Sequence, residues 1–324
     1  MTGGTGLIGS HVADRLRRRG DEVVALVRAE NDAGHLESIG CRLVTGDVLE
    51  PAEAIARLMR GCDAVVHAAA IVFRPVSRSE YLRVNVEGTE RVLWAAGLAA
   101  PRVVHVSSVA VYAGLPMDRP LTERRWLEAD PSRQNAYAAS KHLSERAAWR
   151  LHEAGAIRLT TVRPSVVYGE RDRSATPLLV RWASMPVIPL PGGGRSALPL
   201  VYAGNVAAAV VAALDREASS GRAYNAARDH PITGRELFVR VAKELGRRPR
   251  ILPVPVAPLI GLGTAIEAVA RRVPGIRTRD LLRGVRSLTR DNPYASGRAR
   301  LELGWSGLTD HAEGLRRTLD WWRS

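Results

Sequence analysis

Cysteine is nearly absent from this chain of 324 residues. Cys41 and Cys62 are too few for the disulfide framework that stabilises many small secreted domains. The Cys and His residues also lack the spacing of a metal site, so we predict no bound metal. Together these two absences favour the reducing cytoplasm as the location of the protein.

Long apolar runs are missing as well. No stretch of the sequence is apolar for the roughly 20 residues that a membrane-spanning helix needs. No charged segment followed by an apolar one stands at the start, as it would in a secretory leader. We therefore expect a protein without firm membrane association.

Lysine is scarce in a chain that is strongly basic. The formal net charge is +14, and of 47 Lys and Arg residues only Lys141 and Lys243 are lysine. A basic surface can indicate nucleic acid or an anionic membrane as partner. Here the arginines are spread along the whole sequence without interleaved aromatic residues, so we expect a solvated basic surface and no nucleic-acid partner. Some of the basic side chains are expected to face an anionic cofactor.

A glycine-rich segment, residues 2–10, opens the sequence. Apolar residues then recur every four positions at Ile8, Val12 and Leu16, which places them on one face of a helix. The backbone N–H groups at the start of such a helix, here those of Leu7 and Ile8, have no partner within the helix and attract anions. We predict a turn that presents these groups to a bound anion.

The three glycines of this segment have the spacing of a dinucleotide-binding loop. Gly3 permits the tight turn, Gly6 lets a pyrophosphate approach the backbone, and Gly9 lets the helix pack closely on a sheet. A plain glycine-rich turn is the alternative, because such a pattern is weak evidence on its own. The strand expected at Glu22–Val27 completes the start of a βαβ unit and favours dinucleotide binding.

Strands and helices alternate as far as about residue 113. The expected strands are short, β-branched and apolar on both faces, as in a buried parallel sheet. This alternation predicts an α/β fold with a doubly wound parallel sheet (Rossmann), which binds ligands at the carboxyl ends of its strands. The expected strands are Val23–Val27, Arg42–Val44, Ala64–His67 and Val103–Ser107, and the expected helices are Leu7–Arg19, Pro51–Met59 and Glu80–Ala99.

The glycine loop lacks the strand that should precede it. In this fold the loop follows the central strand of the sheet, yet only Met1 precedes Thr2. Without that strand, two neighbouring strands would have unpaired backbone groups. We therefore expect that the first strand is truncated and that the start at Met1 is internal. The arginine-rich composition suggests a GC-rich gene, in which a valine codon can serve as a start, so that Met1 would replace a valine within the strand.

The residue after the second expected strand bears on the choice of cofactor. Folds that prefer NAD place Asp or Glu here, where it accepts a hydrogen bond from the ribose hydroxyl, whereas an arginine can pair with the additional phosphate of NADP. This chain has Val27 followed by Arg28, which favours NADP. The carboxylates of Glu30 and Asp32 lie nearby in the sequence and keep NAD open.

Further cofactor contacts are expected at the ends of the next two strands. Asp47 and Val48 follow the third expected strand, where the carboxylate could accept a hydrogen bond from the adenine amino group. His67 ends the fourth and is more simply explained as a histidine at the edge of the core than as a catalyst. Small residues follow it and would let a flat cofactor lie against the backbone, although a strand end made of small residues explains them equally well: Ala68, Ala69 and Ala70.

Tyr137 and Lys141 stand four residues apart and so share one face of a helix. A phenol, with a pKa of about 10, is a poor acid–base group at neutral pH unless a nearby cation favours its ionised form. Lys141 could supply that charge, and it is one of only two lysines in the chain. A surface Tyr–Lys pair without function is the alternative.

With these residues in place, the whole chain resembles an extended short-chain dehydrogenase/reductase, of the broad group that contains NAD-dependent epimerases and dehydratases, 3β-hydroxysteroid dehydrogenases and dihydroflavonol reductases. The motifs are specific to that family, though not to one substrate. They are Thr2–Ser10, Gly46–Val48, His67–Ala70, Val84–Thr89, Ser107–Tyr112, Tyr137–Lys141, Val162–Gly169, Ala299–Trp305 and Gly314–Trp322.

The resemblance implies a catalytic set. Tyr137 would be the acid–base group, and Lys141 would lower the pKa of Tyr137 and hold the nicotinamide ribose. Ser108, which stands four residues before Tyr112, would hydrogen-bond the substrate oxygen. Hydride would then pass between a substrate carbon and the nicotinamide while Tyr137 moves the proton.

The resemblance also implies supporting roles. Asn85 would brace the active site, and the backbones of Pro164 and Val167 would line the nicotinamide site. Members of the family commonly dimerise through two long helices, which correspond here to Glu80–Ala99 and Ala136–Glu153. A homodimer is therefore possible.

The composition changes after Gly169. Proline and glycine punctuate residues 186–195, and short strands and helices follow. We expect residues 1–168 to form the dinucleotide-binding domain and residues 169–324 a smaller substrate-binding subdomain. Residues 198–225 are expected to return to the Rossmann half.

Two departures from the family pattern concern the substrate. Members that act on nucleotide sugars often carry an Asn after an Arg-Tyr-Phe stretch, where this chain has Arg163, Pro164 and Ser165. They also carry an Arg-Asp pair that matches Leu198 and Pro199 here. Losing that arginine removes a clamp for phosphate, although Arg195 could compensate. The segment Leu252–Ala270 is nearly uncharged and suggests an apolar lid or pocket helix, or else a contact with a membrane surface or an entry for an apolar substrate.

The sequence thus predicts an NAD(P)-dependent oxidoreductase that transfers hydride to or from a carbonyl or secondary alcohol of an apolar or ring-shaped small molecule. NADP is the expected cofactor, with NAD possible. A nucleotide-sugar epimerase or dehydratase is the alternative within enzymes. The alternative of another class is a dinucleotide-binding sensor or scaffold without turnover, which would have no need for Ser108, Tyr137 and Lys141.

Overall fold

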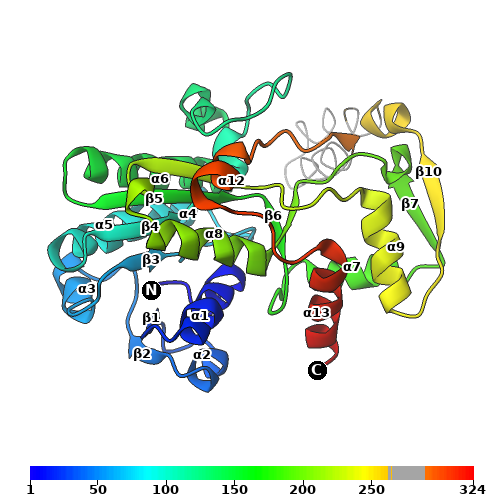
Figure 1. Ribbon diagram of the computed structural model, residues 1–324. Coiled ribbons are helices and arrows are strands. Elements are labelled where there is room, and N and C mark those ends of the chain that lie inside the picture. Colours follow the sequence, from blue (N-terminus) through cyan, green and yellow to red (C-terminus); the bar gives the residue numbers. More distant parts are fainter. Residues whose placement is uncertain (262–263, 265–288) are drawn as a thin grey trace.

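The computed structural model of the chain describes residues 1–261, 264 and 289–324 (Figure 1). It is an α/β structure whose strands pair in parallel, which confirms the predicted fold class at that level. The largest sheet has four strands in the order β3-β4-β5-β9. These strands are β3 (Val65–His67), β4 (Arg102–Val106), β5 (Arg158–Pro164) and β9 (Arg222–Ala226).

A separate pair of strands lies beside β3. β1 (Val24–Val27) pairs in parallel with β2 (Arg42–Thr45). Within the described residues, the bridges between this pair and the four-stranded sheet run through Thr2, which pairs with Leu26 on one side and His67 on the other. Thr2 thus occupies the position between β1 and β3 where the sequence predicted a central strand.

Helices cover both faces of these strands. On one face α1 (Leu7–Arg19) and α8 (Ala203–Asp215) lie side by side and share a core with alternate strand residues such as Val104 and Val162. The residues between them, such as Val103 and Leu159, pack on the other face against three helices. Those helices are α3 (Ala52–Leu58), α5 (Gly88–Ala99) and α6 (Ala136–Glu153).

The predicted helix Glu80–Ala99 is not regular. It consists of α4 (Arg78–Leu82), one π-helical turn at Arg83–Glu87, and α5. A π-turn inserts an extra residue into the helical spacing and is common at functional sites. Here the π-turn contains Asn85, whose side chain is buried. The sequence periodicity gave no sign of it.

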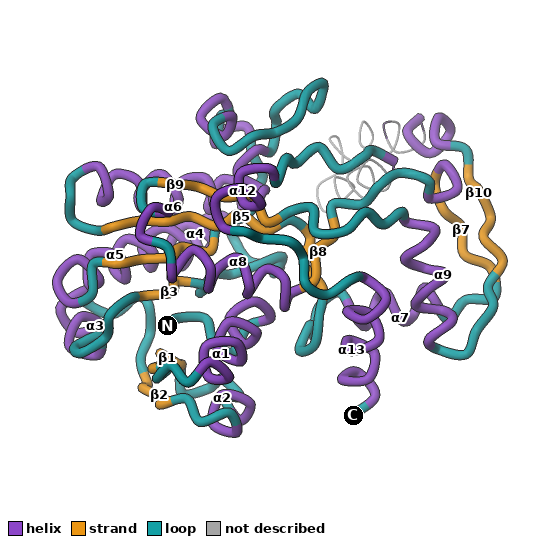
Figure 2. The backbone as a smooth tube through the Cα atoms, in the orientation of Figure 1, coloured by secondary structure: helices purple, strands orange, loops and turns teal. Residues whose placement is uncertain are grey.

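The C-terminal part has a hydrophobic core of its own (Figure 2). In it β7 pairs in parallel with β10, and the sequence analysis had assigned neither strand. Leu252–Val254 lie in β10, whereas residues 262–263 and 265–270 of the expected apolar lid lie outside the described residues. The elements of this part are β6 (Val166–Tyr168), α7 (Thr176–Ala183), β7 (Val187–Pro191), β8 (Leu200–Tyr202), α9 (Gly234–Glu244), β10 (Arg250–Val254) and α13 (His311–Arg323). In contrast, α12 (Gly297–Leu303) packs on β9 and α8, and the short α2 (Gly34–Ser38) lies near α1.

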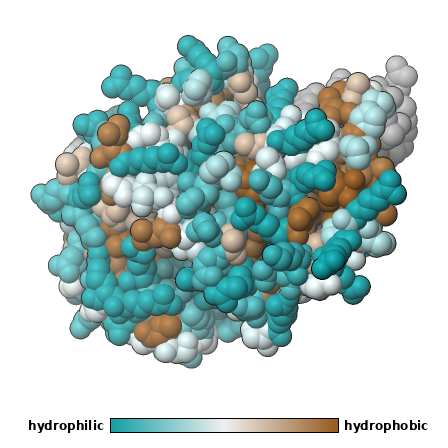
Figure 3. All heavy atoms as spheres, turned by 45° about the vertical axis from the view of Figure 1, so that its right-hand side comes forward, coloured by the Kyte–Doolittle hydropathy of each residue, from teal (hydrophilic) through white to brown (hydrophobic). Residues whose placement is uncertain are grey.

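The surface of the C-terminal part is partly apolar. Side chains of α7, β7 and β10 are exposed there, among them Trp182, Val187 and Leu252. On the face shown in Figure 3, hydrophobic residues gather on the side of this part, whereas much of the remaining surface is hydrophilic. The basic and polar residues that dominate the composition therefore do not cover the molecule evenly.

Residues 198–225 contribute to both parts. β8 pairs in parallel with β6, while α8 packs on α1 and β9 forms the edge of the four-stranded sheet beside β5. None of the helices within the described ranges is long and apolar enough to cross a membrane.

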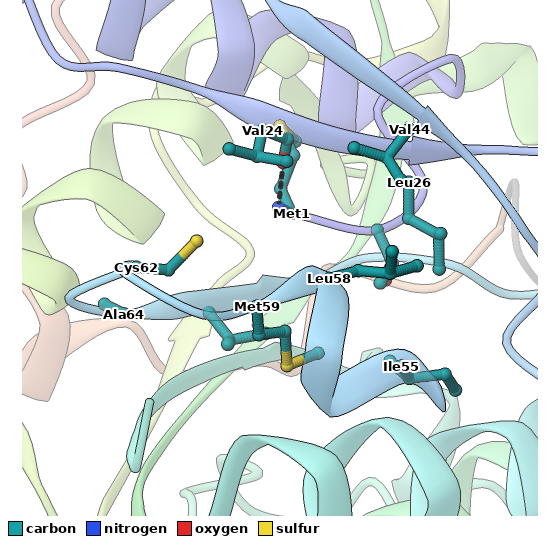
Figure 4. Close-up of a pocket in the computed structure, with 11 residues that line it drawn as sticks. Met1, Val24, Leu26, Val44, Ile55, Leu58, Met59, Cys62 and Ala64 are labelled. Atoms are coloured by element: carbon teal, nitrogen blue, oxygen red, sulfur yellow. Dashed lines mark hydrogen bonds between the residues drawn. The ribbon is translucent and has the colours of Figure 1, made fainter. Parts of the chain in front are cut away.

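A small cavity lies beside the first two residues. It has a volume of about 30 Å³, and the close-up shows apolar side chains from β1, β2, α3 and the strand region around β3 pointing into it (Figure 4). The amino group of Met1 is buried there and donates a hydrogen bond to the carbonyl of Val24. Its burial lowers the pKa of this amino group. The seam between β1 and β3 therefore contains a small apolar cavity beside Met1 and Thr2.

Candidate active site

The glycine loop is shaped by contacts that exclude side chains. Gly3 has φ = 72°, in the left-handed region, and a Cβ atom there would lie 2.5 Å from the backbone of Ala68 and Ala69. A Cβ on Gly9 would lie only 2.0 Å from the carbonyl oxygen of Gly3. Both distances are impossible for a real side chain, so only glycine fits at either position.

The N-terminus of α1 fits a diphosphate group. Gly6 is its exposed N-cap, and no side chain in the described part of the protein caps the helix. The first turn contains Leu7 and Ile8 and no acidic residue. Uncapped N–H groups and the positive end of the helix dipole together make a site for an anion. The loop therefore suits the pyrophosphate of a dinucleotide.

Arg28 and Asp47 lie where they were predicted, after β1 and β2. The guanidinium of Arg28 is about half exposed and pairs with Glu30, with Nε and Oε1 3.2 Å apart, and it also bonds to Asn31. One carboxylate oxygen of Asp47 accepts a hydrogen bond from the N–H of Leu49 at 2.8 Å. A 2′-phosphate would have to compete with Glu30 for Arg28.

The segment after β3 is fixed from both sides. Ala68 and Ala69 lie against the glycine loop, and the N–H of Ala68 donates to the carbonyl of Thr2. One residue beyond Ala70, the side chain of Asn85 makes two hydrogen bonds to the backbone of Ile71, accepting at 2.7 Å and donating at 3.0 Å. Asn85 thus braces the loop that leaves β3.

Tyr137 and Ser108 meet in the structure. Tyr137 lies in the first turn of α6, and Ser108 follows β4. Burial raises the pKa of the Tyr137 phenol, and a hydrogen bond with the Ser108 side chain works in the opposite direction. Ser108 also accepts a hydrogen bond from the N–H of Ala110 at 3.1 Å, which orients its hydroxyl. The structure therefore places Ser108 close enough to the Tyr137 phenol to affect its pKa.

Lys141 lies one helical turn further along α6 and is buried. Its ammonium group donates to the carbonyl of Val106 at 2.9 Å, at the carboxyl end of β4. Burial lowers the pKa of Lys141 to about 8, although the nearby Glu145 carboxylate opposes this shift. The ammonium is thus held at the end of the strand that leads to Ser108.

A buried ion pair behind this set was not predicted. Glu145 on α6 and Arg163 on β5 are both fully buried and form a salt bridge. Glu145 also accepts a hydrogen bond from Ser107 at 2.6 Å, and Arg163 donates to Tyr112 at 2.7 Å. Burial alone would raise the pKa of Glu145, but the charge and hydrogen bonds of Arg163 hold it below its usual value. The pair ties α6 to the strands that carry the active-site segments.

A sequence signal for this pair did exist. Glu145 stands four residues after Lys141, on the same helical face, and Arg163 directly precedes Pro164. Pro164 ends β5, and Val167 lies in β6, which pairs with β8 rather than with the four-stranded sheet.

His67 is a structural residue, as expected. It is buried, and its two ring nitrogens bond to the hydroxyls of Thr2 and Thr89 at 2.7 and 2.9 Å. Its ring stacks on that of His105, its partner in the β3–β4 register. Burial, followed by the charge of Lys141, lowers the pKa of His67 to about 3, so the ring stays neutral.

Comparison with known proteins agrees with this geometry. Residues 1–227 match the model of the NAD dependent epimerase/dehydratase family. A 4-hydroxy-2-methyl-3-oxo-4-farnesyl-3,4-dihydroquinoline-1-oxide ketoreductase from Stigmatella aurantiaca is 30% identical over 97% of this chain and 93% of its own length. A ceramide reductase from Caulobacter vibrioides is 26% identical over 100% of this chain and 94% of its own. A dTDP-glucose 4,6-dehydratase double mutant from Streptomyces venezuelae, solved with NAD, superposes with a TM-score of 0.75 at 27% identity, covering 100% of this chain and 96% of that one.

The chain therefore belongs to the NAD dependent epimerase/dehydratase family. It is an NAD(P)-dependent oxidoreductase of the extended short-chain dehydrogenase/reductase type, as the motifs predicted.

Proposed function

From this membership we propose that the enzyme reduces the carbonyl group of an apolar, ring-shaped or lipid-like ketone with NAD(P)H, and that Tyr137 is the acid. The proposal is carried by the position of Ser108 after β4, close enough to affect the pKa of the Tyr137 phenol, together with the Lys141 ammonium one turn away on α6 at the end of the same strand. The names of two full-length relatives, a ketoreductase of a farnesylated ring compound and a ceramide reductase, support the substrate class.

The residues of the chain would share the work as follows. The bound dinucleotide supplies hydride to the carbonyl carbon. Tyr137 donates its phenolic proton to the carbonyl oxygen, so that the C=O bond becomes a C–H and an O–H bond. Ser108 holds that oxygen by a hydrogen bond. Lys141 carries a positive charge in this neighbourhood and stabilises the phenolate that remains.

The structure allows each of these roles. Because burial raises the pKa of Tyr137, the phenol keeps its proton at neutral pH until a charged group helps to remove it. Lys141, with a pKa of about 8, is mostly protonated at pH 7 and lies one helical turn from Tyr137. In the bound state we place the backbones of Pro164 and Val167 beside the nicotinamide.

We assign the cofactor to residues 1–168 together with α8 and β9, which complete the layers around the sheet. The strands β2-β1, Thr2 and β3-β4-β5-β9 then act as one doubly wound sheet with its ligand at the carboxyl ends. We propose NADP(H) as the preferred form, because Arg28 at the end of β1 can pair with a 2′-phosphate. The segment 169–324 would supply most of the substrate contacts.

A nucleotide-sugar substrate is less well supported. At the position of the arginine that clamps phosphate in such enzymes, this chain has Leu198, which is buried in the C-terminal core and donates its N–H to Ile232. Pro199 next to it carries no charge. A sensor or scaffold without turnover would not need Ser108, Tyr137 and Lys141 to be assembled.

A second copy of the chain is the macromolecular partner that we propose. The outer face of α5 exposes Trp94 and Leu98, which are 51% and 60% exposed. Trp94 lies in an open depression of about 420 Å³ that residues of α3, α5 and α6 form. An apolar surface of this kind on two neighbouring helices suits a helical dimer interface.

Replacing Tyr137 with Phe tests the function. We expect NADPH oxidation with an apolar ketone to fall at least about 100-fold, because general acid catalysis contributes roughly 10²–10⁴-fold. Binding of NADPH alone, followed by fluorescence, should remain, since the ring and its packing are kept. Full turnover by Tyr137→Phe would refute the mechanism, and a wild-type protein that binds NADPH but reduces no ketone would refute the function.

A further inference from the structure

The loop that leaves β3 carries an exposed aromatic residue directly over the proposed acid. The ring of Phe73 packs against the ring of Tyr137, with centroids 4.8 Å apart and planes tilted by 46°. On another side, the ring of Tyr81 from α4 meets Tyr137 edge-on with centroids 6.2 Å apart. Tyr137 therefore lies between two aromatic rings, of which Tyr81 is buried and Phe73 is 76% exposed.

The backbone at Phe73 is held in an unfavourable conformation. Its φ angle is 47°, in the left-handed region that a residue with a bulky side chain rarely adopts. Of the non-glycine residues that the structure describes, only Phe73 and Arg171 have a positive φ. Such strain persists only where the surrounding structure enforces it, and it occurs preferentially at ligand sites.

Two anchors enforce this conformation. On the N-terminal side, Asn85 makes two hydrogen bonds to the backbone of Ile71. On the C-terminal side, the hydroxyl of Tyr81 donates to the carbonyl of Arg74 at 2.8 Å. Only Val72 and Phe73 lie between these two fixed points, and Val72 is also 47% exposed. The loop thus presents two apolar side chains to solvent on a backbone that is held in place.

We propose that Phe73, supported by Val72, is a specificity-determining residue that forms an apolar wall for the substituent next to the reacting carbonyl. This inference rests on the proposed function and deepens it. Exposing a phenyl ring to water is unfavourable, whereas an aliphatic chain or a ring that packs on it removes apolar surface from water. Because the ring touches Tyr137, a substrate whose carbonyl oxygen reaches the phenol would bring its neighbouring carbons against Phe73.

Two substrates with the same reacting group separate this role from catalysis. NADPH oxidation would be followed with ethyl 3-oxobutanoate, which has a short chain, and with ethyl 3-oxodecanoate, which has a long one. For Phe73→Ala we expect kcat/KM for the long ester to fall about tenfold, mainly through KM, and that for the short ester to change less than about twofold. Phe73→Tyr should retain the preference for the long ester, because it keeps the ring.

Two further variants serve as controls. Phe73→Gly removes the ring and also relieves the backbone strain, so it should lose the same preference as Phe73→Ala. Leu301→Ala removes a side chain on α12 that is 86% exposed, and it should leave the ratio of the two kcat/KM values unchanged.

Failure of the inference differs from failure of the proposed function. If the wild type reduces neither ester although it binds NADPH, the proposed function fails together with this inference. If the wild type reduces both and Phe73→Ala lowers kcat equally for both esters, Phe73 acts by positioning Tyr137 and the specificity role is wrong. An unchanged ratio in Phe73→Ala overturns the proposal as well.

Discussion

The two halves of the cofactor region differ in how their strands are joined. The strands β3, β4, β5 and β9 form a continuous parallel ladder, reinforced by the buried pair of Arg163 and Glu145. The strands β1 and β2 pair with each other, and Thr2 provides the bridges between them and that ladder. The proposed catalytic residues lie on the first half, whereas Arg28 and Asp47 lie on the second.

The two halves also have different proposed tasks, namely proton transfer and cofactor binding. The proposed proton transfer would require Ser108, Tyr137 and Lys141 to be placed precisely, and these residues lie beside the continuous four-stranded sheet. The adenosine end of a dinucleotide tolerates more freedom, because it contributes binding rather than chemistry. We therefore expect substitutions in the four-stranded half to affect folding strongly, and those at β1 and β2 to affect cofactor affinity.

The largest effect is expected at the buried ion pair. Arg163→Met leaves the Glu145 carboxylate buried without its partner, which should cost about 3–5 kcal/mol of unfolding free energy. Urea denaturation measures this loss. The exposed pair of Arg158, on the same strand β5, and Glu217 is the matched control, and Arg158→Met should cost less than about 1 kcal/mol. Similar losses for the two variants would show that the four-stranded half is not specially stabilised by its buried pair.

Lowering the pH should reduce the free energy of unfolding by a smaller amount, because of a histidine at the seam between the two halves. The pKa of folded His67 is about 3, whereas an unfolded histidine has a pKa of about 6.5. As the pH falls below 6.5 the unfolded chain takes up a proton that the folded one does not, so stability decreases. For His67 this amounts to about 2 kcal/mol between pH 7 and pH 5.

His105 should add to the same slope, because burial and then the charge of Lys141 also lower its pKa well below the usual value. Neither ring nitrogen of His105 has a hydrogen-bond partner among the described residues. His105→Phe keeps an aromatic ring on His67 and removes the titrating group, so the loss of unfolding free energy between pH 7 and pH 5 should be smaller than in the wild type. Thermal or urea denaturation at both pH values checks this, and an undiminished slope would contradict it.

Substitutions in the second half, at β1 and β2, should change the affinity for the cofactor rather than the stability of the fold. Arg28→Ala removes the cation proposed to pair with a 2′-phosphate and should weaken NADPH binding about tenfold while changing NADH binding little. Arg42→Ala is a suitable control and should leave the preference between NADPH and NADH unchanged, because Arg42 starts β2 at the opposite end of the sheet from Arg28. Equal losses for NADPH and NADH in Arg28→Ala would remove the preference for NADP(H).

Sequence patterns predicted the regular elements well and the irregular ones poorly. The helices Leu7–Arg19 and Ala136–Glu153 lie where they were predicted, the first from its apolar periodicity and the second from the family resemblance. The π-turn around Asn85 and the left-handed Phe73 could not be predicted, since they depend on tertiary hydrogen bonds to Ile71 and from Tyr81. Local propensity contains no information about such contacts.

The site shows the same division. Ser108, Tyr137 and Lys141 were predicted from spacing and from family resemblance, and the structure places Ser108 close enough to Tyr137 to affect the pKa of its phenol. The pairing of Glu145 with Arg163 joins residues that are 18 positions apart in the sequence, so it needed the packing of α6 on β5 to become visible. What the sequence analysis missed is therefore the support behind the catalytic residues rather than those residues themselves.

The smallest loss of stability is expected when Thr2 is replaced. Because Thr2 bridges the two halves, this variant also tests most directly whether they differ in stability. Its hydroxyl bonds to His67 at 2.7 Å and, more weakly, accepts from the N–H of Ala69 at 3.4 Å. Thr2→Val keeps the shape but removes the hydroxyl, which should cost about 1–2 kcal/mol because the ring nitrogen of His67 loses its partner.

Hydrogen exchange should then speed up at β1 and β2 and remain slow at β4 and β5, since local opening follows the weaker connections. Thr2→Ser retains the hydroxyl and should restore protection at β1 and β2. If hydrogen exchange in Thr2→Val instead became faster in all the strands alike, the two halves would unfold as one unit. The difference in how their strands are joined would then not affect their local opening.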